Sequence, residues 1–280
     1  GSWGNDLTRI EGSAWYQHDE REGVTLRTNR AIDHDEVYDS PKRTERLVLG
    51  LGQRIKLGSV AHFRWHVGGT AYQNRFVEDL RGSPVFSERR TSIDQFAQAN
   101  RFDLAAVPGL SLTAGVEWGT ESLAVDRDRI HPGGAAERSE EVARTREWTF
   151  EPWIQGDLRL AQDRLEIVPG VRLVLHDAFG VEAAPSLALR VNLWTGATLR
   201  LSGARGYRAP SLKDRYLDFD HSALGYRVHG NPDLKPESSW GLNLSLSQRV
   251  GKVLDLRLGA YANRIKDLIT FVNEGVSAEG

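Results

Sequence analysis

The sequence predicts an all-β fold, an antiparallel up-and-down transmembrane β-barrel, and three observations support this class. Apolar and polar residues alternate with a period of two wherever the chain is apolar. The connections between these segments are of a short and a long kind, and the long ones fall at one end of the meander. Mean hydropathy is only −0.44, which suits such a barrel because every second side chain faces a polar lumen.

The alternation is clearest in the segment 240–247. Its two faces are Trp240, Leu242, Leu244 and Leu246, against Gly241, Asn243, Ser245 and Ser247. The same pattern recurs at 47–57, 165–175, 185–193 and 254–260. Successive side chains of a strand point to opposite faces, so this period fits strands and not helices.

The alternating segments predict about eleven strands, with a twelfth that starts near Leu268. The expected ranges are 7–19, 44–57, 59–78, 91–105, 110–126, 144–160, 164–177, 183–193, 197–205, 238–249 and 252–264. Long loops are expected near 20–43, 79–90, 127–143 and 206–237, with the shorter 178–182 link at the same end. Outer-membrane barrels have tight periplasmic turns and long extracellular loops, so the asymmetry favours a membrane barrel over a soluble one.

Charged and aromatic residues agree with this interpretation. Charges on the polar faces would be costly in a sandwich core unless they were paired, but a wide lumen solvates them; examples are Arg54, Glu117, Arg190 and Arg257. Aromatic residues near strand ends or on outward files suit the girdles at a membrane interface; they are Trp118, Trp148, Trp194, Trp240 and Tyr261. The alternative is that the tryptophans fill the core of a sandwich.

Composition excludes several other classes. The formal net charge of −2 gives no overall basic character for binding nucleic acid. The chain has no cysteine for disulfides or thiolate metal sites. It has no methionine either, and we expect that residue 1 is not a native start. No run of about 18 apolar residues predicts a membrane-spanning helix. Nucleophile elbow, phosphate loop and HExxH motifs are all missing, and we expect no enzyme activity.

A charged, proline-stiffened stretch, GNPDLKPESSW at 230–240, leads directly into the alternating segment at 240. Pro232 and Pro236 rule out a regular helix there and leave an extended, solvated segment. Asn231 and Asp233 are suited to capping turns. The stretch is therefore expected to form a loop that directs the chain back into the sheet.

The longer stretch ARGYRAPSLKDRYLDFDHSALGYRVHGNPDLKPESSWGLNLSLSQ, 204–248, resembles TonB-dependent outer-membrane receptors. Their barrels carry a strand that ends in G-[FY]-[RK]-A-P-S, followed by a GNPDLKPE loop and a new strand. LEIVPGVRLVLHDAFG (165–180) and AYANRIKDLITF (260–271) are similar to two further segments of this family. The resemblance is specific over roughly 160–272, and residues 1–280 are expected to be one barrel segment without a separate second domain.

The resemblance implies a barrel of about 22 strands, a plug domain, and a TonB-contacting box. We expect this chain to be part of such a barrel, with its plug elsewhere; a complete barrel of about twelve strands is the alternative. The family further implies uptake of a scarce nutrient across the Gram-negative outer membrane, without a cofactor. A ferric siderophore is the first expectation, before cobalamin, haem or an oligosaccharide. A passive porin-like channel and a soluble all-β binding module are the rival functions.

Two sets of candidate residues lie in the motif region. An architectural role is expected for Arg205, Gly206, Tyr207, Pro210, Asn231, Pro232, Asp233, Pro236 and Glu237. Aromatic and basic side chains of the 206–237 loop could hold an anionic chelate by charge and stacking; the candidates are Tyr226, Arg227, His229 and Arg208. Arg208 lies inside the motif, so a structural tether is its alternative role.

No metal site is predicted. The acidic run 33–36 offers oxygen ligands for a hard cation, but it lacks a complete loop pattern and fits a solvated charge run better. His62 and His66 share a strand face at a separation of about 13 Å, too far apart for one metal ion. Both are expected to be lumenal or buried histidines.

Overall fold

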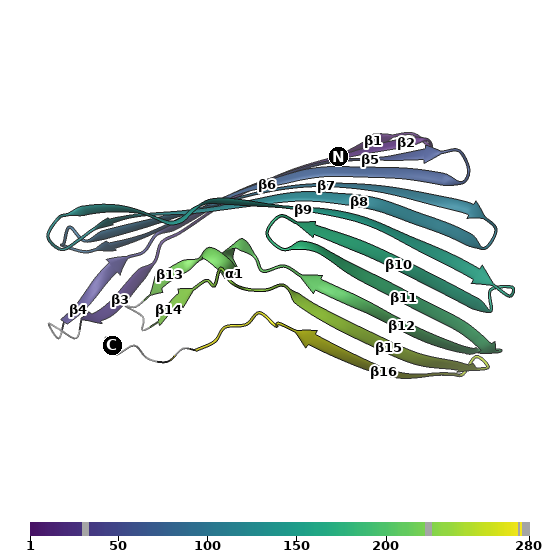
Figure 1. Cartoon of the computed structure of the whole chain (residues 1–280). Helices are drawn as coiled ribbons and strands as arrows, with labels where there is room; N and C mark the ends of the chain where they lie inside the picture. The colour runs from purple at the N-terminus through teal and green to yellow at the C-terminus, as the bar shows by residue number, and fades with distance from the viewer. Residues whose placement is uncertain (30–33, 222–225, 274, 276–280) are drawn as a thin grey trace.

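The computed structural model describes residues 1–29, 34–221, 226–273 and 275. One large antiparallel sheet dominates it (Figure 1). Its main path contains β1 (Ser2–Gly4), β2 (Thr8–Arg21), β5 (Lys42–Leu57), β6 (Ala61–Leu80), β7 (Phe86–Val107), β8 (Leu110–Ile130), β9 (Ala136–Leu160), β10 (Leu165–His176), β11 (Gly180–Trp194), β12 (Ala197–Arg208), β15 (Glu237–Val250) and β16 (Leu254–Lys266).

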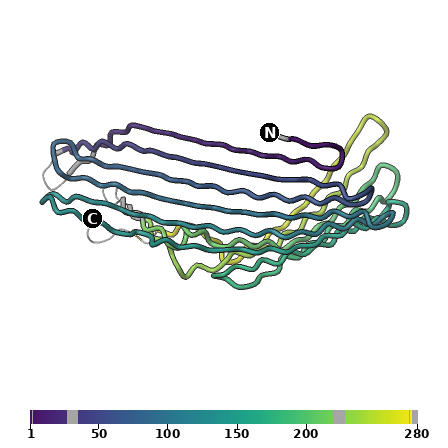
Figure 2. The backbone as a smooth tube through the Cα atoms, turned by 90° about the horizontal axis from the view of Figure 1, so that it is seen from above, coloured from purple at the N-terminus to yellow at the C-terminus, as the bar shows by residue number. Residues whose placement is uncertain are grey.

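Each strand of this path pairs with the next one, in the order β1-β2-β5-β6-β7-β8-β9-β10-β11-β12-β15-β16. The predicted all-β, up-and-down antiparallel architecture is thereby confirmed. The sheet does not close on itself in the described residues: it bends into an open trough with β1 and β16 at its two edges (Figure 2).

Two of the expected long loops are mostly strand. β6, β7, β8 and β9 extend through 79–90 and 127–143 and leave only short turns at 81–85 and 131–135. Charged cross-strand contacts support these extensions: Arg75 donates to Glu88 at 2.8 and 2.7 Å, and Arg90 donates to the same carboxylate at 2.5 Å. The prediction was wrong here because it relied on apolar files, and strands outside lipid do not need them.

The first long connection contains a hairpin of β3 (Val24–Asn29) and β4 (His34–Asp39). β4 also pairs briefly with the end of β6. Arg81, in the following turn, donates to both oxygens of the Asp39 carboxylate, at 2.6 and 3.0 Å. These hydrogen bonds lower the pKa of Asp39, because they favour the charged carboxylate.

Two expectations near the C-terminus are also wrong. The segment after β16 contains no strand among the described residues, so a twelfth strand does not start near Leu268. Asp267 adopts a positive φ of 54° that turns the chain, and the Ile269 N–H donates to the Glu237 carboxylate at 2.6 Å. Tyr261 is not on an outward file: it lies opposite Asn243, on the face away from Leu242 and Leu244.

The two faces of the sheet differ in chemistry. One face carries in-register apolar rows, for example Ile55, Phe63, Phe102, Ile154 and Val171. Many of these side chains are open to the surroundings; Leu242 and Leu256 are 56% and 53% exposed. Soluble monomers rarely expose apolar areas this extensive, whereas lipid covers them in a membrane barrel. No helix in the described residues is long and apolar enough to cross a membrane.

The two faces predict opposite responses to one substitution at neighbouring positions. Leu244→Arg puts a charge on the lipid side of β15 and should destabilise the protein by about 2–4 kcal/mol. Asn243→Arg, on the other face, should cost less than about 1 kcal/mol because water reaches it. Urea unfolding of the full-length protein from lipid vesicles measures both values. Equal losses for the two variants would contradict the assignment of the faces.

Candidate ligand site on the inner face

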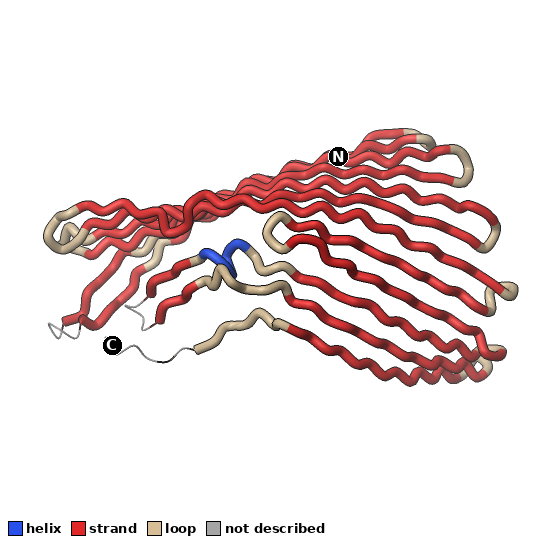
Figure 3. Tube along the Cα trace, viewed as in Figure 1, coloured by secondary structure: helices blue, strands red, loops and turns tan. Residues whose placement is uncertain are grey.

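The connection between β12 and β15 folds back over the sheet instead of extending away from it (Figures 1 and 3). It contains the short helix α1 (Leu212–Tyr216) and a hairpin of β13 (Asp218–His221) and β14 (Tyr226–His229). α1 packs against β8 and β9, and the face that it covers is called the inner face below.

Local chemistry starts the helix. Ser211 accepts a hydrogen bond from the Asp214 N–H at 3.1 Å, and the Asp214 carboxylate accepts one from the Ser211 N–H at 2.9 Å. This reciprocal capping box satisfies two backbone donors at the start of the helix. Pro210, which precedes Ser211, is fully buried; its architectural role stays a prediction.

An apolar contact anchors the helix to the sheet. Leu212 is 2% exposed and packs against Leu123, Val125 and Val142, which are at most 5% exposed. The strands β8 and β9 change register between Leu123 and Asp126. Bulges of this kind redirect side chains, and here three apolar side chains meet on a face that is otherwise largely polar.

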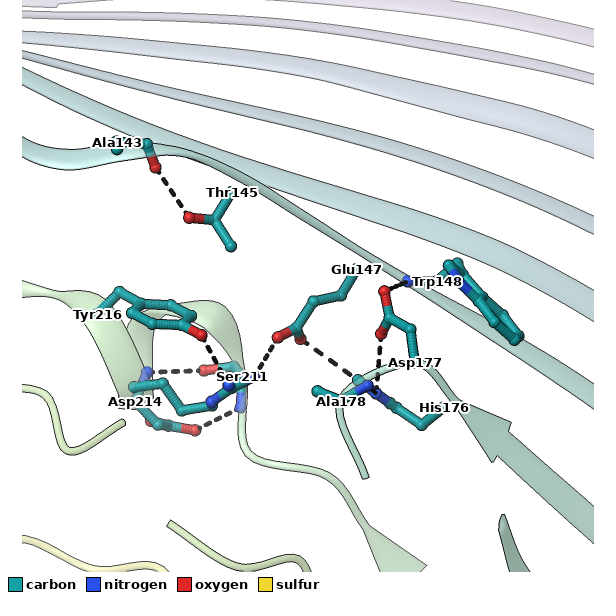
Figure 4. Close-up of polar contacts among 11 residues, drawn as sticks. Ala143, Thr145, Glu147, Trp148, His176, Asp177, Ala178, Ser211, Asp214 and Tyr216 are labelled. Atoms are coloured by element: carbon teal, nitrogen blue, oxygen red, sulfur yellow. Dashed lines mark hydrogen bonds and ion pairs between the residues drawn. The ribbon is translucent and has the colours of Figure 1, made fainter. Parts of the chain in front are cut away.

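A polar network anchors the other side of the helix. Arg215, 9% exposed, forms a short ion pair with Glu147 and donates to the Tyr216 hydroxyl at 2.6 Å. Its guanidinium also lies 4.9 Å from the Phe179 ring centroid. Glu147 Oε2 is 3.7 Å from His176 Nε2, so the network continues into the end of β10 (Figure 4).

The network is fixed to the strand ends through Asp177. Its carboxylate lies 3.2 Å from His176 Nδ1 and accepts a hydrogen bond from the Trp148 N–H at 3.2 Å. Figure 4 shows Glu147 between Tyr216 on one side and Asp177 and His176 on the other. Burying an arginine this deeply requires a paired carboxylate, and Glu147 supplies it.

A polar cavity of about 320 Å³ opens beside this network on the inner face. Arg172 and Glu151 in its lining form an ion pair at 2.9 Å, and Arg205, also in the lining, lies 2.7 Å from Glu182 outside it. Its other members are Thr149, Val174, His176, Ala184, Gly206, Tyr207 and Ala209. The cavity therefore offers guanidinium, imidazole and phenol groups to a ligand.

The predicted ligand residues are only partly placed by the structure. Tyr226 and Arg227 lie on β14, and their side chains fall outside the described part of the chain. His229 is half exposed, and its Nδ1 lies 3.3 Å from Asp218 Oδ1. Arg208 donates to Glu237 at 3.0 Å, which ties the end of β12 to the start of β15. A ligand role for these four residues stays a prediction.

The GNPDLKPE stretch forms the return of the loop. The Asn231 side chain accepts from the Asp233 N–H at 2.9 Å, and Pro232 and Pro236 flank this turn. The Asn231 N–H donates to the Asp214 carbonyl at 2.9 Å. A Cβ on Gly230 would lie 2.7 Å from the carbonyl carbon of Arg215, so glycine permits the close contact with α1.

The residues considered as metal ligands form no metal site in the part of the chain that the structure describes. Asp33 lies outside the described residues, and Glu36 accepts a hydrogen bond from the Tyr38 hydroxyl at 2.8 Å. His62 and His66 both lie on the inner face of β6. The described residues contain no group of three or more His, Asp or Glu side chains arranged to hold a metal ion.

Sequence reasoning did not single out Glu147, His176, Leu212, Arg215 or Gly230. The S-x-x-D spacing of Ser211 and Asp214 is a capping pattern and was available as a signal for α1. Arg215 and Glu147 are separated by 68 residues, and no local pattern connects them.

A bent antiparallel sheet with a lipid-facing apolar side and a loop folded onto its inner side defines an outer-membrane barrel protein. A family model described as TonB dependent receptor-like, beta-barrel, matches residues 2–280. The chain therefore belongs to the TonB-dependent receptor family, as its barrel region, and its place is the Gram-negative outer membrane.

Relatives of known name agree with this family. The chain is 33% identical over 120 residues to the iron-regulated outer membrane virulence protein of Vibrio cholerae serotype O1, a match that covers 43% of this chain and 18% of the relative. It is 24% identical over 260 residues to the vitamin B12 transporter BtuB of Photobacterium profundum, covering 88% and 36%. The chain thus spans well under half the length of these curated relatives.

Solved structures share the fold. The ferric enterobactin receptor PfeA of Pseudomonas aeruginosa superposes with a TM-score of 0.68 at 19% identity, over 95% of this chain and 41% of that chain. The siderophore receptor PirA of the same organism gives a TM-score of 0.65 at 17% identity, over 94% and 44%.

The apolar anchor gives a first prediction for this site. Leu212→Ala should weaken docking of the 209–236 segment by about 2–5 kcal/mol, because it removes a buried side chain from the cluster. Hydrogen exchange of the full-length protein should then show faster exchange in this segment, with the sheet unchanged. Lys213→Ala, at an exposed position of the same helix, is the control. Unchanged protection in Leu212→Ala would show that the cluster does not hold the loop.

The close contact at Gly230 gives a second prediction. Gly230→Ala forces Cβ against the backbone of Arg215, so α1 and the loop return must separate. We expect increased protease cleavage within 209–236, whereas Gly241→Ala, where a Cβ meets open space, should leave cleavage unchanged. Equal cleavage of the two variants would contradict the steric argument.

Proposed function

We propose that this chain forms part of the barrel of a receptor that imports a scarce nutrient by TonB-dependent active transport, with a ferric siderophore as the ligand. The observation that carries the proposal is the loop anchored on the inner face beside a polar cavity. The relative named as iron-regulated and the structures titled as siderophore receptors support the ligand class. The relative named as a vitamin B12 transporter makes cobalamin the second candidate.

In this mechanism the chain supplies the capture step. A ligand that enters from the loop end meets the β13–β14 hairpin and then the cavity that Arg172, Arg205 and His176 help to line. Both arginines already have carboxylate partners, so an anionic chelate would bind by competing for their guanidinium groups. The plug domain and TonB would supply the energised release. No step requires bond chemistry, consistent with a receptor and not an enzyme.

The proposal is tested by uptake of radiolabelled iron bound to catecholate, hydroxamate or carboxylate siderophores. Cells that express the full-length protein should accumulate one of these chelates, and loss of TonB should abolish accumulation. Labelled cobalamin, tested in parallel, distinguishes the second candidate. Uptake that does not depend on TonB, together with steady large currents in planar bilayers, would favour a passive porin-like channel instead.

The loop makes a specific prediction for this function. The double variant Tyr226→Ala/Arg227→Ala should weaken binding of the transported ligand at least about tenfold, a loss of about 1.4 kcal/mol. Stacking and charge on β14 are removed, while the anchors at Leu212 and Arg215 remain. Lys252→Ala, in the β15–β16 turn at the opposite end of the sheet, should bind normally. Unchanged affinity of the double variant would exclude β14 from ligand capture.

A further inference from the structure

A cluster of buried charges joins three strands of the sheet beyond the apolar rows. β7, β8 and β9 continue there as the segments 86–90, 126–130 and 136–142, which we call the arm. Arg89 and Arg127 lie directly opposite each other on β7 and β8. The Glu141 carboxylate on β9 pairs with both, at 2.6 Å from Arg89 and 3.1 Å from Arg127. The three side chains are each 11% exposed, so this chain alone already encloses most of the cluster.

The two arginines differ in what they contact besides Glu141. The Arg127 guanidinium donates to the Ser87 hydroxyl at 3.0 Å, so its contacts in the described chain stay within the arm. Arg89 donates to the backbone carbonyl of Asp218 at 3.2 Å, across 129 residues of sequence. Burial lowers the pKa of Arg89, and the negative charges of Glu141 and Asp218 oppose this effect. Arg89 therefore links the arm to the first residue of β13, through a hydrogen bond and through charge.

This contact lies at the base of the β13–β14 hairpin. The Gly230 N–H donates to the Leu217 carbonyl at 2.7 Å and closes the base. Asp218 is paired with His229, and the register continues along the two strands as far as Tyr226. Because the backbones of paired strands are joined by hydrogen bonds, a contact that holds Asp218 also holds the backbone of β14.

The anchors of α1 do not fix the direction of the hairpin by themselves. The helix ends at Tyr216, and its anchors Leu212 and Arg215 both precede the hairpin. A chain that leaves an anchored helix can still rotate about its φ and ψ angles. A second contact beyond the helix removes this freedom, and the hydrogen bond from Arg89 is such a contact.

We propose that Arg89 is a positioning residue for the β13–β14 hairpin: by holding the Asp218 carbonyl it sets where the candidate ligand residues of β14 lie. Tyr226, Arg227 and His229 belong to this strand. The consequence for ligand capture rests on the proposed function, because a displaced hairpin would present these residues in the wrong place. The position of the hairpin itself does not depend on which nutrient is transported.

Hydrogen exchange of the full-length protein tests this position without a ligand. Arg89→Gln should make 218–221 and 226–229 exchange at least about tenfold faster, with α1 and the sheet unchanged. Glu141 keeps Arg127 as its partner in this variant, so no buried carboxylate is left unpaired. Arg89→Lys keeps the charge and can donate to a single carbonyl acceptor, so it should retain most of the protection.

Arg127→Gln is the matched control. It removes the same charge from the same cluster at the same burial, but no contact with the hairpin, so hairpin protection should not change. Binding of the three radiolabelled ferric chelates from the uptake experiment is the second readout. The chelate that the unmodified protein binds should bind at least about tenfold more weakly to Arg89→Gln, and normally to Arg127→Gln.

Unchanged hairpin protection in Arg89→Gln, or an equal loss of protection in Arg127→Gln, would overturn the proposal. Faster exchange in Arg89→Gln with unchanged affinity for the chelate would overturn the role of hairpin position in capture. Failure of the proposed function gives a different result: the unmodified protein then binds none of the three chelates, while the difference in hydrogen exchange between Arg89→Gln and Arg127→Gln remains.

Discussion

Backbone pairing in register is the constraint on which this structure depends. Lipid offers no hydrogen bonds, so each backbone N–H and C=O group in the membrane must find a partner on a neighbouring strand. Continuous pairing then fixes which residues share a face along the whole sheet. The strand register places Leu242, Leu201 and Leu244 on the lipid face. It places Arg54 and Arg64 on the inner face for the same reason.

The anchor of α1 on the inner face depends on a local departure from regular strand pairing. Where β8 and β9 change register, Leu123, Val125 and Val142 converge around Leu212. A regular ladder would keep these side chains in separate rows. The bulge therefore produces a small apolar core on a polar face, and the buried pair of Arg215 and Glu147 fixes the orientation of the helix on that core. The register change in β8 and β9 thus also determines where the loop lies on the sheet.

The same physics explains what the sequence reveals. Apolar alternation at 240–247 predicts β15 correctly because lipid contact requires an apolar file. The extensions of β6 and β7 toward the 81–85 turn could not be predicted from apolar alternation. They are stabilised by charged pairs such as Arg75 and Glu88, and charged residues are also typical of loops. Contacts between Arg215 and Glu147 join distant segments and leave no local pattern. The GNPDLKPE stretch was recognisable, but the need for glycine at Gly230 is apparent only from its closeness to α1.

Arginines occur on the inner face in two environments with different consequences. Near the loop end, Arg89 is 11% exposed and lies 2.6 Å from Glu141; a guanidinium that loses its water must gain a carboxylate. Nearer the short turns, Arg64 is 39% exposed and lies 2.7 Å from Asp103; water screens such a pair, so it contributes little to stability. A deeply buried arginine therefore cannot lose its carboxylate without destabilising the fold, whereas an exposed arginine can.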